Sequence, residues 1–224
     1  MSKTLNHDLI AFLLGDAEAS PALENWLKTE EGRRELSAYR ETFHAIDRLY
    51  RNVSSSDKPA QVSYTEMSTP IGKIFVAATD KGLVRISFML SESGFVSELR
   101  TRLNRDVVES PGKVAGVVQQ LQEYFAGKRS RFDVAIDWSL ATPFQRRVLA
   151  AASLVPPGSV ASYGELARRI GQPGASRAVG NALGHNPLPI VIPCHRIVRE
   201  GGNLGGYTGG LHIKKRLLEI EGAL

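Results

Sequence analysis

Cysteine is almost absent from this sequence. Cys194 is the only one among 224 residues. A single thiol excludes an internal disulfide and any zinc site built from several cysteines. Proteins of a reducing compartment usually lack disulfides, so we expect a cytoplasmic location.

Long apolar runs are also missing. No run approaches the roughly 20 residues of a membrane helix. The short apolar run Leu9–Leu14 is bracketed by Asp8 and Asp16, which argues against a signal peptide. With 42% hydrophobic and 23% charged residues, the composition is that of a globular protein of one large or two modest domains. We expect no membrane partner.

Acidic residues become scarce toward the C-terminus. Residues 139–224 contain ten Lys and Arg against four Asp and Glu, whereas the rest of the chain is nearly balanced, and the net charge is +5. A solvated basic face would account for this excess, and such faces are common. A phosphate-binding surface is the sharper interpretation, because the charge collects in the segment that carries Cys194.

Changes of hydrophobic spacing divide the chain into three parts. Residues 1–58 indicate a helical extension followed by a linker, with Ser20-Pro21 as the N-cap and first turn of one helix. Residues 59–138 indicate an α/β module. Its expected strands are 64–67, 74–78, 83–88 and 132–136, with a turn at 80–82, and its expected helices are 95–103 and 114–125.

The third part, residues 139–224, is predicted to be mainly helical. Thr142 is a plausible cap for a helix over 143–154, and another helix ends near Glu221. Between them, helices over 163–170 and 175–183 flank a turn that contains glycine. This is the helix-turn-helix pattern, although many such pairs bind nothing.

The stretch Ile190–Val198 carries the reactive groups. Cys194 follows Pro193 and precedes His195 and Arg196. A thiol reacts as the thiolate, which needs a nearby base, donor or positive charge, and His195 is the adjacent candidate. Neighbours on a strand point to opposite faces, so a buried structural cysteine beside a packed histidine is an open alternative.

Several short motifs occur together in a fixed order. They are Arg177-Ala178-Val179-Gly180, Asn186-Pro187, Pro193-Cys194-His195-Arg196 and Gly205-Gly206-Tyr207-Thr208-Gly209-Gly210. In order and spacing, this set closely resembles the O6-alkylguanine-DNA alkyltransferases. The resemblance is continuous from about Pro143 to Glu221 and looser back to about Tyr64. It does not include residues 1–58, which lack the cysteines of the zinc domain that some relatives carry there.

The resemblance implies both a fold and an activity. The fold is a ribonuclease-H-like α/β module followed by a helical, winged helix-turn-helix-like DNA-binding domain. The activity is DNA repair by direct reversal, in which a methyl or larger alkyl group moves once from O6 of guanine, or O4 of thymine, to Cys194. The partner is double-stranded DNA containing O6-alkylguanine, no metal or cofactor is involved, and the damaged base rotates out of the helix into a pocket.

The resemblance also implies roles for individual residues. In catalysis, His195 takes the thiol proton of Cys194 through a water, Glu221 orients the imidazole, Asn186 is a hinge, and Tyr207 donates to N3 of guanine. On DNA, Arg177 fills the space left by the base and Tyr163 pushes the adjoining phosphate. Small residues let the second helix of the pair enter the minor groove; they are Ala175, Ser176, Ala178 and Gly180. The expected pocket residues are Leu183 and Pro189 as walls, the Ile197 carbonyl and Thr208 as polar contacts, and Gly209 as room for larger groups.

Other functions compete with this one. A lesion-sensing DNA-binding module could recruit repair factors through the N-terminal helices. A cysteine hydrolase would need an oxyanion loop, and nothing in the sequence resembles one. A metal site using His185, Cys194, His195 and His212 has no recognised ligand spacing.

Overall fold

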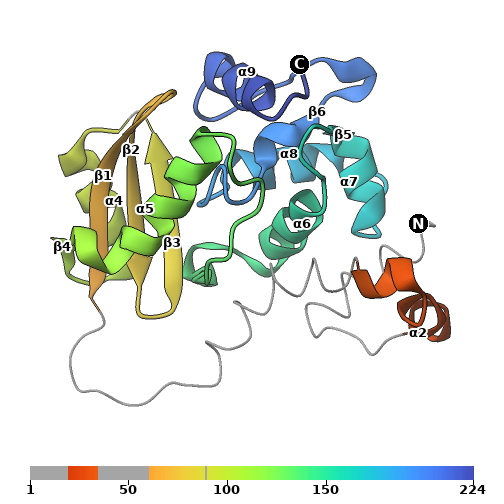
Figure 1. Ribbon diagram of the computed structural model, residues 1–224, viewed down its shortest axis with the longest axis horizontal. Coiled ribbons are helices and arrows are strands. Elements are labelled where there is room, and N and C mark those ends of the chain that lie inside the picture. The colour runs from red at the N-terminus through yellow and green to blue at the C-terminus, as the bar shows by residue number, and fades with distance from the viewer. Residues whose placement is uncertain (1–19, 35–60, 89) are drawn as a thin grey trace.

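The computed structural model describes residues 20–34, 61–88 and 90–224 (Figure 1). The expected helices within residues 1–19 and 35–53 and the expected linker lie outside this range. Helix α2 (Pro21–Leu27) begins as predicted, because the Ser20 hydroxyl accepts a hydrogen bond from the Leu23 amide and proline occupies the first turn.

The first domain contains a four-stranded sheet of order β3-β2-β1-β4. Strands β1 (Val62–Thr69), β2 (Gly72–Thr79) and β3 (Gly82–Phe88) form an antiparallel meander, and β4 (Val107–Glu109) pairs in parallel with β1. The predicted turn before β3 is confirmed. Gly82 has φ of +132°, and a Cβ there would lie 2.4 Å from the Ala135 carbonyl oxygen, so this turn requires glycine.

Alternate residues of β2 are buried on opposite faces of the sheet. Phe75 and Ala77 pack with α4 (Glu92–Leu103), whereas Ile74 and Val76 belong to the larger core that includes α5 (Pro111–Phe125). That larger core continues into the second domain, so the sheet face carrying Ile74 and Val76 connects the two domains.

The strand expected at 132–136 is wrong. This segment makes only an isolated bridge between Ile136 and Leu83, after which the chain turns into η1 (Trp138–Leu140), where Asp137 caps the first turn. The alternation of apolar residues reflects burial beside the sheet rather than a strand in it. The segment covers the edge of β3 together with Pro187, whose carbonyl accepts from the Ile86 amide at 2.8 Å.

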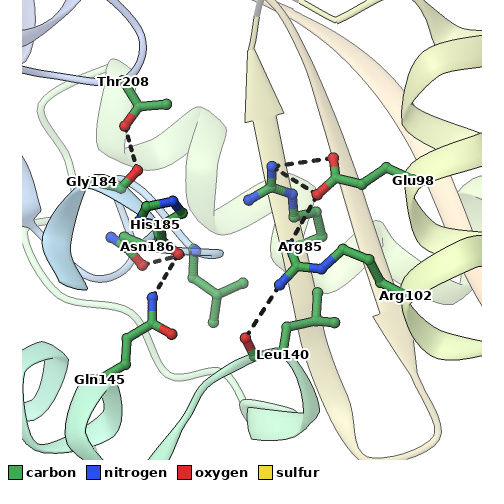
Figure 2. Close-up of polar contacts among 10 residues, drawn as sticks. Arg85, Glu98, Arg102, Leu140, Gln145, Gly184, His185, Asn186 and Thr208 are labelled. Atoms are coloured by element: carbon green, nitrogen blue, oxygen red, sulfur yellow. Dashed lines mark hydrogen bonds and ion pairs between the residues drawn. The ribbon is translucent and has the colours of Figure 1, made fainter. Parts of the chain in front are cut away.

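A chain of polar contacts fastens α4 to the sheet and to η1. Figure 2 shows Arg85 of β3 and Arg102 of α4 meeting Glu98, while Arg102 also reaches the Leu140 carbonyl. Through the Leu140 carbonyl, these contacts link α4 to the segment that precedes the second domain.

The second domain is helical. Helix α6 (Pro143–Ser153) starts after Thr142, whose hydroxyl caps it as predicted. Helices α7 (Tyr163–Arg169) and α8 (Ser176–Gly184) pack together on either side of the predicted turn. The last elements are η2 (Cys194–Arg196), β6 (Ile197–Val198), which pairs with β5 (Ala161–Ser162), η3 (Glu200–Gly202) and α9 (Leu211–Ile220). Figure 1 shows α9 above the site where α8 and the cysteine segment meet.

Candidate active site

The cysteine segment is a 3-10 turn rather than a strand. Cys194, His195 and Arg196 form η2, and Ile197 begins β6 only afterwards. The alternation rule for strands therefore does not apply to Cys194 and His195, and this expectation is corrected. Cys194 is 7% exposed, and the other two side chains are buried.

Asn186 connects the end of α8 to the cysteine. Its amide nitrogen donates to the Ile192 carbonyl at 2.9 Å and to the Cys194 sulfur at 3.1 Å. Its amide oxygen accepts from the Leu188 backbone at 2.9 Å. One buried side chain thus shapes the loop and directs a hydrogen-bond donor at the sulfur.

A buried charge network lies beside the thiol. Glu221 Oε1 is 3.0 Å from His195 Nε2, and both side chains are almost fully buried. Arg196 binds the same carboxylate through Nε at 2.7 Å and a terminal nitrogen at 2.9 Å, and it also donates to the Val155 carbonyl. This bidentate pairing neutralises the carboxylate, a role that the sequence analysis did not assign to Arg196.

Two buried polar atoms of the site have no hydrogen-bond partner within the described residues. They are His195 Nδ1 and the Tyr207 hydroxyl. The Tyr207 hydroxyl lies close enough to the sulfur to affect its pKa but does not meet hydrogen-bond geometry. Both atoms are therefore available to other groups in the site.

Burial and hydrogen bonding together determine the protonation of the three reactive groups. It raises the pKa of the Cys194 thiol, against the opposing effects of the Asn186 donor, Tyr207 and the positive charge of Lys214. It lowers the pKa of His195, so the imidazole is neutral at pH 7 and able to accept a proton. Burial alone would raise the pKa of Glu221, but hydrogen bonds from His195 and Arg196 outweigh it and lower this pKa to about 2.

Lys214 is a buried ammonium under the site that the sequence analysis missed. Its Nζ donates to the Ile197 carbonyl at 2.5 Å and to the Leu204 carbonyl, and burial lowers its pKa to about 8. It thus ties the cysteine segment to the loop before α9. The signal was present, because Lys214 lies three and four residues before Leu217 and Leu218 on the buried stripe of α9.

A cavity of about 570 Å³ has Cys194 in its wall. The residues that line it come from α7, α8 and the cysteine-to-α9 loop, and they are Tyr163, Ser176, Arg177, Gly180, Leu183, Gly184, Cys194, Arg199, Gly206, Tyr207 and Thr208. Of the residues expected to contact DNA or to form the pocket, Ala175, Ala178, Pro189, Ile197 and Gly209 do not line it, and neither do the expected catalytic residues Asn186, His195 and Glu221. Pro189 instead lines a neighbouring space of about 50 Å³ beside Phe88 and Cys194. Arg199 is an addition that the sequence analysis missed.

Three of the expected pocket residues are already engaged. A Cβ on Gly209 would lie 2.3 Å from the Phe88 ring, so glycine here permits close packing against Phe88. The Ile197 carbonyl accepts from Lys214. The Thr208 hydroxyl donates to the Gly184 carbonyl at 2.5 Å, as Figure 2 shows, and so ties the loop before α9 to the end of α8.

Helix α8 presents a small, uncharged surface around one arginine. Val179, Ala182 and Leu183 are buried, whereas Arg177 and Ala178 are exposed. Figure 2 shows the Gln145 amide of α6 pointing at His185, which follows α8, and it donates to the His185 carbonyl at 2.7 Å. The same amide also donates to the Ala182 carbonyl at 3.1 Å. The helix has no acidic residue, and its exposed face is shallow enough for close approach to a polyanion.

The fold and the site define a class of protein. A helix-turn-helix lies beside a cavity whose wall holds one buried cysteine backed by a histidine and a glutamate, which is the arrangement of a DNA-binding protein with a cysteine nucleophile. Two domain models match: the ribonuclease-like domain of 6-O-methylguanine DNA methyltransferase at residues 62–138 and its DNA binding domain at 143–223. The chain belongs to the 6-O-methylguanine DNA methyltransferase family.

Curated relatives support this assignment. A methylated-DNA--protein-cysteine methyltransferase of Mycobacterium tuberculosis is 42% identical over 160 residues, which are 71% of this chain and 92% of the relative. A constitutive enzyme of the same name from Bacillus subtilis is 40% identical over 70% of this chain and 94% of its own.

Solved structures agree. Mycobacterium tuberculosis OGT in complex with DNA matches with a TM-score of 0.63 and 40% identity, covering 72% of this chain and 93% of that one. The O6-methylguanine-DNA methyltransferase of Pyrococcus kodakaraensis matches with a TM-score of 0.52 and 29% identity, covering 72% and 99%. The matched family domains begin at residue 62, so they do not include α2.

Two further findings concern metals and membranes. Within residues 20–34, 61–88 and 90–224, no three His, Cys, Asp or Glu side chains are grouped so as to hold a metal ion. Over the same ranges, none of the helices has the length and apolar character needed to cross a bilayer.

Proposed function

We propose that this protein repairs DNA by moving an alkyl group from O6 of guanine in duplex DNA onto Cys194. The observation that carries the proposal is Cys194 in the wall of a cavity of about 570 Å³, with an Asn186 donor 3.1 Å from its sulfur and with the His195–Glu221 pair next to it in the chain. A methyl group or a larger alkyl group fits this cavity, and O4 of thymine is a second substrate atom.

The chemistry follows from the protonation states of the site. His195 takes the thiol proton through a water at Nδ1, and the charge on Glu221 stabilises the imidazolium that forms. The sulfur attacks the alkyl carbon, so the S–C bond forms as the O6–C bond breaks. Tyr207 donates to N3 of the departing guanine, because burial raises its pKa well above the usual value and keeps the hydroxyl protonated. The thioether does not revert, so each molecule acts once.

DNA contact comes from α8 and the start of α7. The shallow surface around Ala175, Ser176, Ala178 and Gly180 enters the minor groove. Arg177, at the cavity rim, replaces the rotated base, which offsets part of the cost of unstacking. Tyr163 lies against Gly180 and pushes the neighbouring phosphate outward. The protein acts in the cytoplasm, where DNA and a reduced thiol occur together.

Peptide mapping by mass spectrometry tests this function. After incubation with duplex DNA carrying O6-methylguanine, the peptide containing Cys194 gains one methyl group and the guanine is restored. A matched sample of Cys194→Ser binds the duplex and gains nothing. A methyl group on any other residue, or an unmodified protein beside repaired DNA, would contradict the proposal.

A further inference from the structure

The ribonuclease-like domain contributes one side chain to the buried network of the second domain. Tyr124, in the last turn of α5, donates its hydroxyl to Glu221 Oε1 at 2.8 Å across 97 residues of sequence. Glu221 Oε1 is the same oxygen that contacts His195 Nε2 at 3.0 Å. The sequence analysis placed no candidate site residue in this domain.

We propose that Tyr124 is a positioning residue for alkyl transfer, whose hydroxyl holds Glu221 Oε1 in the place where it orients His195. This inference rests on the proposed function. Through Tyr124, the first domain acts on the proton acceptor of the second.

The geometry of the carboxylate explains why this hydroxyl matters. Arg196 binds both oxygens of Glu221 in a fork, at 2.7 Å and 2.9 Å. Oε1 also accepts from Tyr124 and His195, so the hydroxyl fixes this oxygen in direction and shares its negative charge.

Tyr124 is itself held firmly. It is 1% exposed, and its ring packs edge-on against Phe125 at 5.3 Å and tilted against Phe132 at 5.6 Å between centroids. Burial raises the pKa of Tyr124 far above the usual value, so the hydroxyl is a neutral donor at every working pH.

Loss of the Tyr124 hydroxyl should change the pKa of His195 in one definite direction. Without it, Glu221 Oε1 carries more negative charge and stabilises a protonated His195 more strongly, which raises the pKa of His195. Arg196 and Lys214, the other charged groups facing His195, are unchanged by this substitution. Since transfer needs a neutral His195, the rate then falls at a higher pH as the solution is acidified.

If Tyr124 only supported the fold, its ring would matter and its hydroxyl would not. Tyr124→Phe keeps the ring and removes one oxygen. Tyr64→Phe is the matched control, because Tyr64 is 7% exposed in β1 of the same domain and donates to Glu92 Oε1 at 2.6 Å. It loses the same type of bond within the other core of the sheet.

The experiment measures single-turnover methyl transfer against pH for the full-length protein and both variants, with thermal unfolding of each. We expect Tyr124→Phe to react about tenfold more slowly at neutral pH, because Glu221 Oε1 is no longer held in the place where it orients His195, and this misplacement outweighs the stronger attraction for the proton. We also expect its acid limb to move to higher pH, while Tyr64→Phe retains the wild-type rate and profile.

One outcome would contradict the positioning role of Tyr124, and a different outcome would contradict the proposed function. A Tyr124→Phe profile that superimposes on that of Tyr64→Phe would overturn the positioning role. An inactive wild-type protein would overturn the proposed function itself.

Discussion

At the Cys194 sulfur, burial and hydrogen bonding act in opposite directions. Burial favours the neutral thiol, which protects the only cysteine of the protein from adventitious reaction. The Asn186 amide and the Lys214 charge favour the thiolate. The neutral thiol is thus favoured at rest, and in the proposed reaction His195 accepts its proton when the sulfur attacks.

Replacing Asn186 isolates the first of these effects. Asn186→Ala removes the donor to the sulfur, so the pKa of Cys194 rises and its reaction with iodoacetamide at neutral pH slows by about tenfold. The rate measured across pH reports Cys194 alone, because no other cysteine exists. Asn203→Ala, in an exposed loop position, is the control and keeps the wild-type curve. An unchanged curve for Asn186→Ala would show that this amide does not tune the thiol.

Among the elements, α8 connects the proposed DNA-binding surface to the cysteine. Its buried face packs on α6 and α7, its exposed face carries Arg177, and its end leads through Asn186 to the cysteine segment. The proposed DNA contact and the proposed chemistry therefore share one helix, whose residues also line the cavity.

Arg177 should matter only when a base must leave a duplex. Arg177→Ala is expected to slow transfer from duplex O6-methylguanine by about tenfold or more, since unstacking costs a few kcal/mol. Transfer from a free O6-alkylguanine base is expected to stay unchanged. Arg216→Ala, an exposed position on α9, controls for lost positive charge. Equal losses on both substrates would contradict a role in base rotation.

The sequence predicted the helices better than it predicted the short strands and the side-chain contacts between distant segments. The bounds of α6, α7 and α8 were close because caps and periodicity are local signals. Strands β4, β5 and β6 have two or three residues each, too few for a periodic pattern. The resemblance to the alkyltransferases implied that Cys194, His195 and Glu221 act together, and the structure places Glu221 against His195. It could not reveal Tyr124 or Lys214, whose partners are brought near only by the fold.

For the molecule as a whole, Glu221 is a point where both domains meet. Tyr124 reaches it from the first domain, while His195 and Arg196 reach it from the second. The Glu221 carboxylate therefore contributes to the stability of the folded protein as well as to the proposed proton transfer.

The stability of the protein should depend on pH through this carboxylate. Its pKa is about 2 in the folded protein against an ordinary 4.5, so its contribution is complete above pH 4.5 and is lost as the pH falls toward 2. That contribution is about 3 kcal/mol. Urea unfolding between pH 5 and pH 3 should give a shallower dependence for Glu221→Gln, which is also less stable at neutral pH. Glu219→Gln, exposed on the same helix, should keep the wild-type slope, and equal slopes in all three proteins would contradict the assignment.

The stoichiometry of repair tests the central claim most directly. A fixed amount of protein is titrated with an excess of duplex containing O6-methylguanine, and the restored guanines are counted against the Cys194 thiols consumed. The account predicts a plateau at one guanine per protein molecule, with every thiol converted to a thioether. Continued repair beyond that plateau, or repair that leaves the Cys194 thiol free, would contradict it.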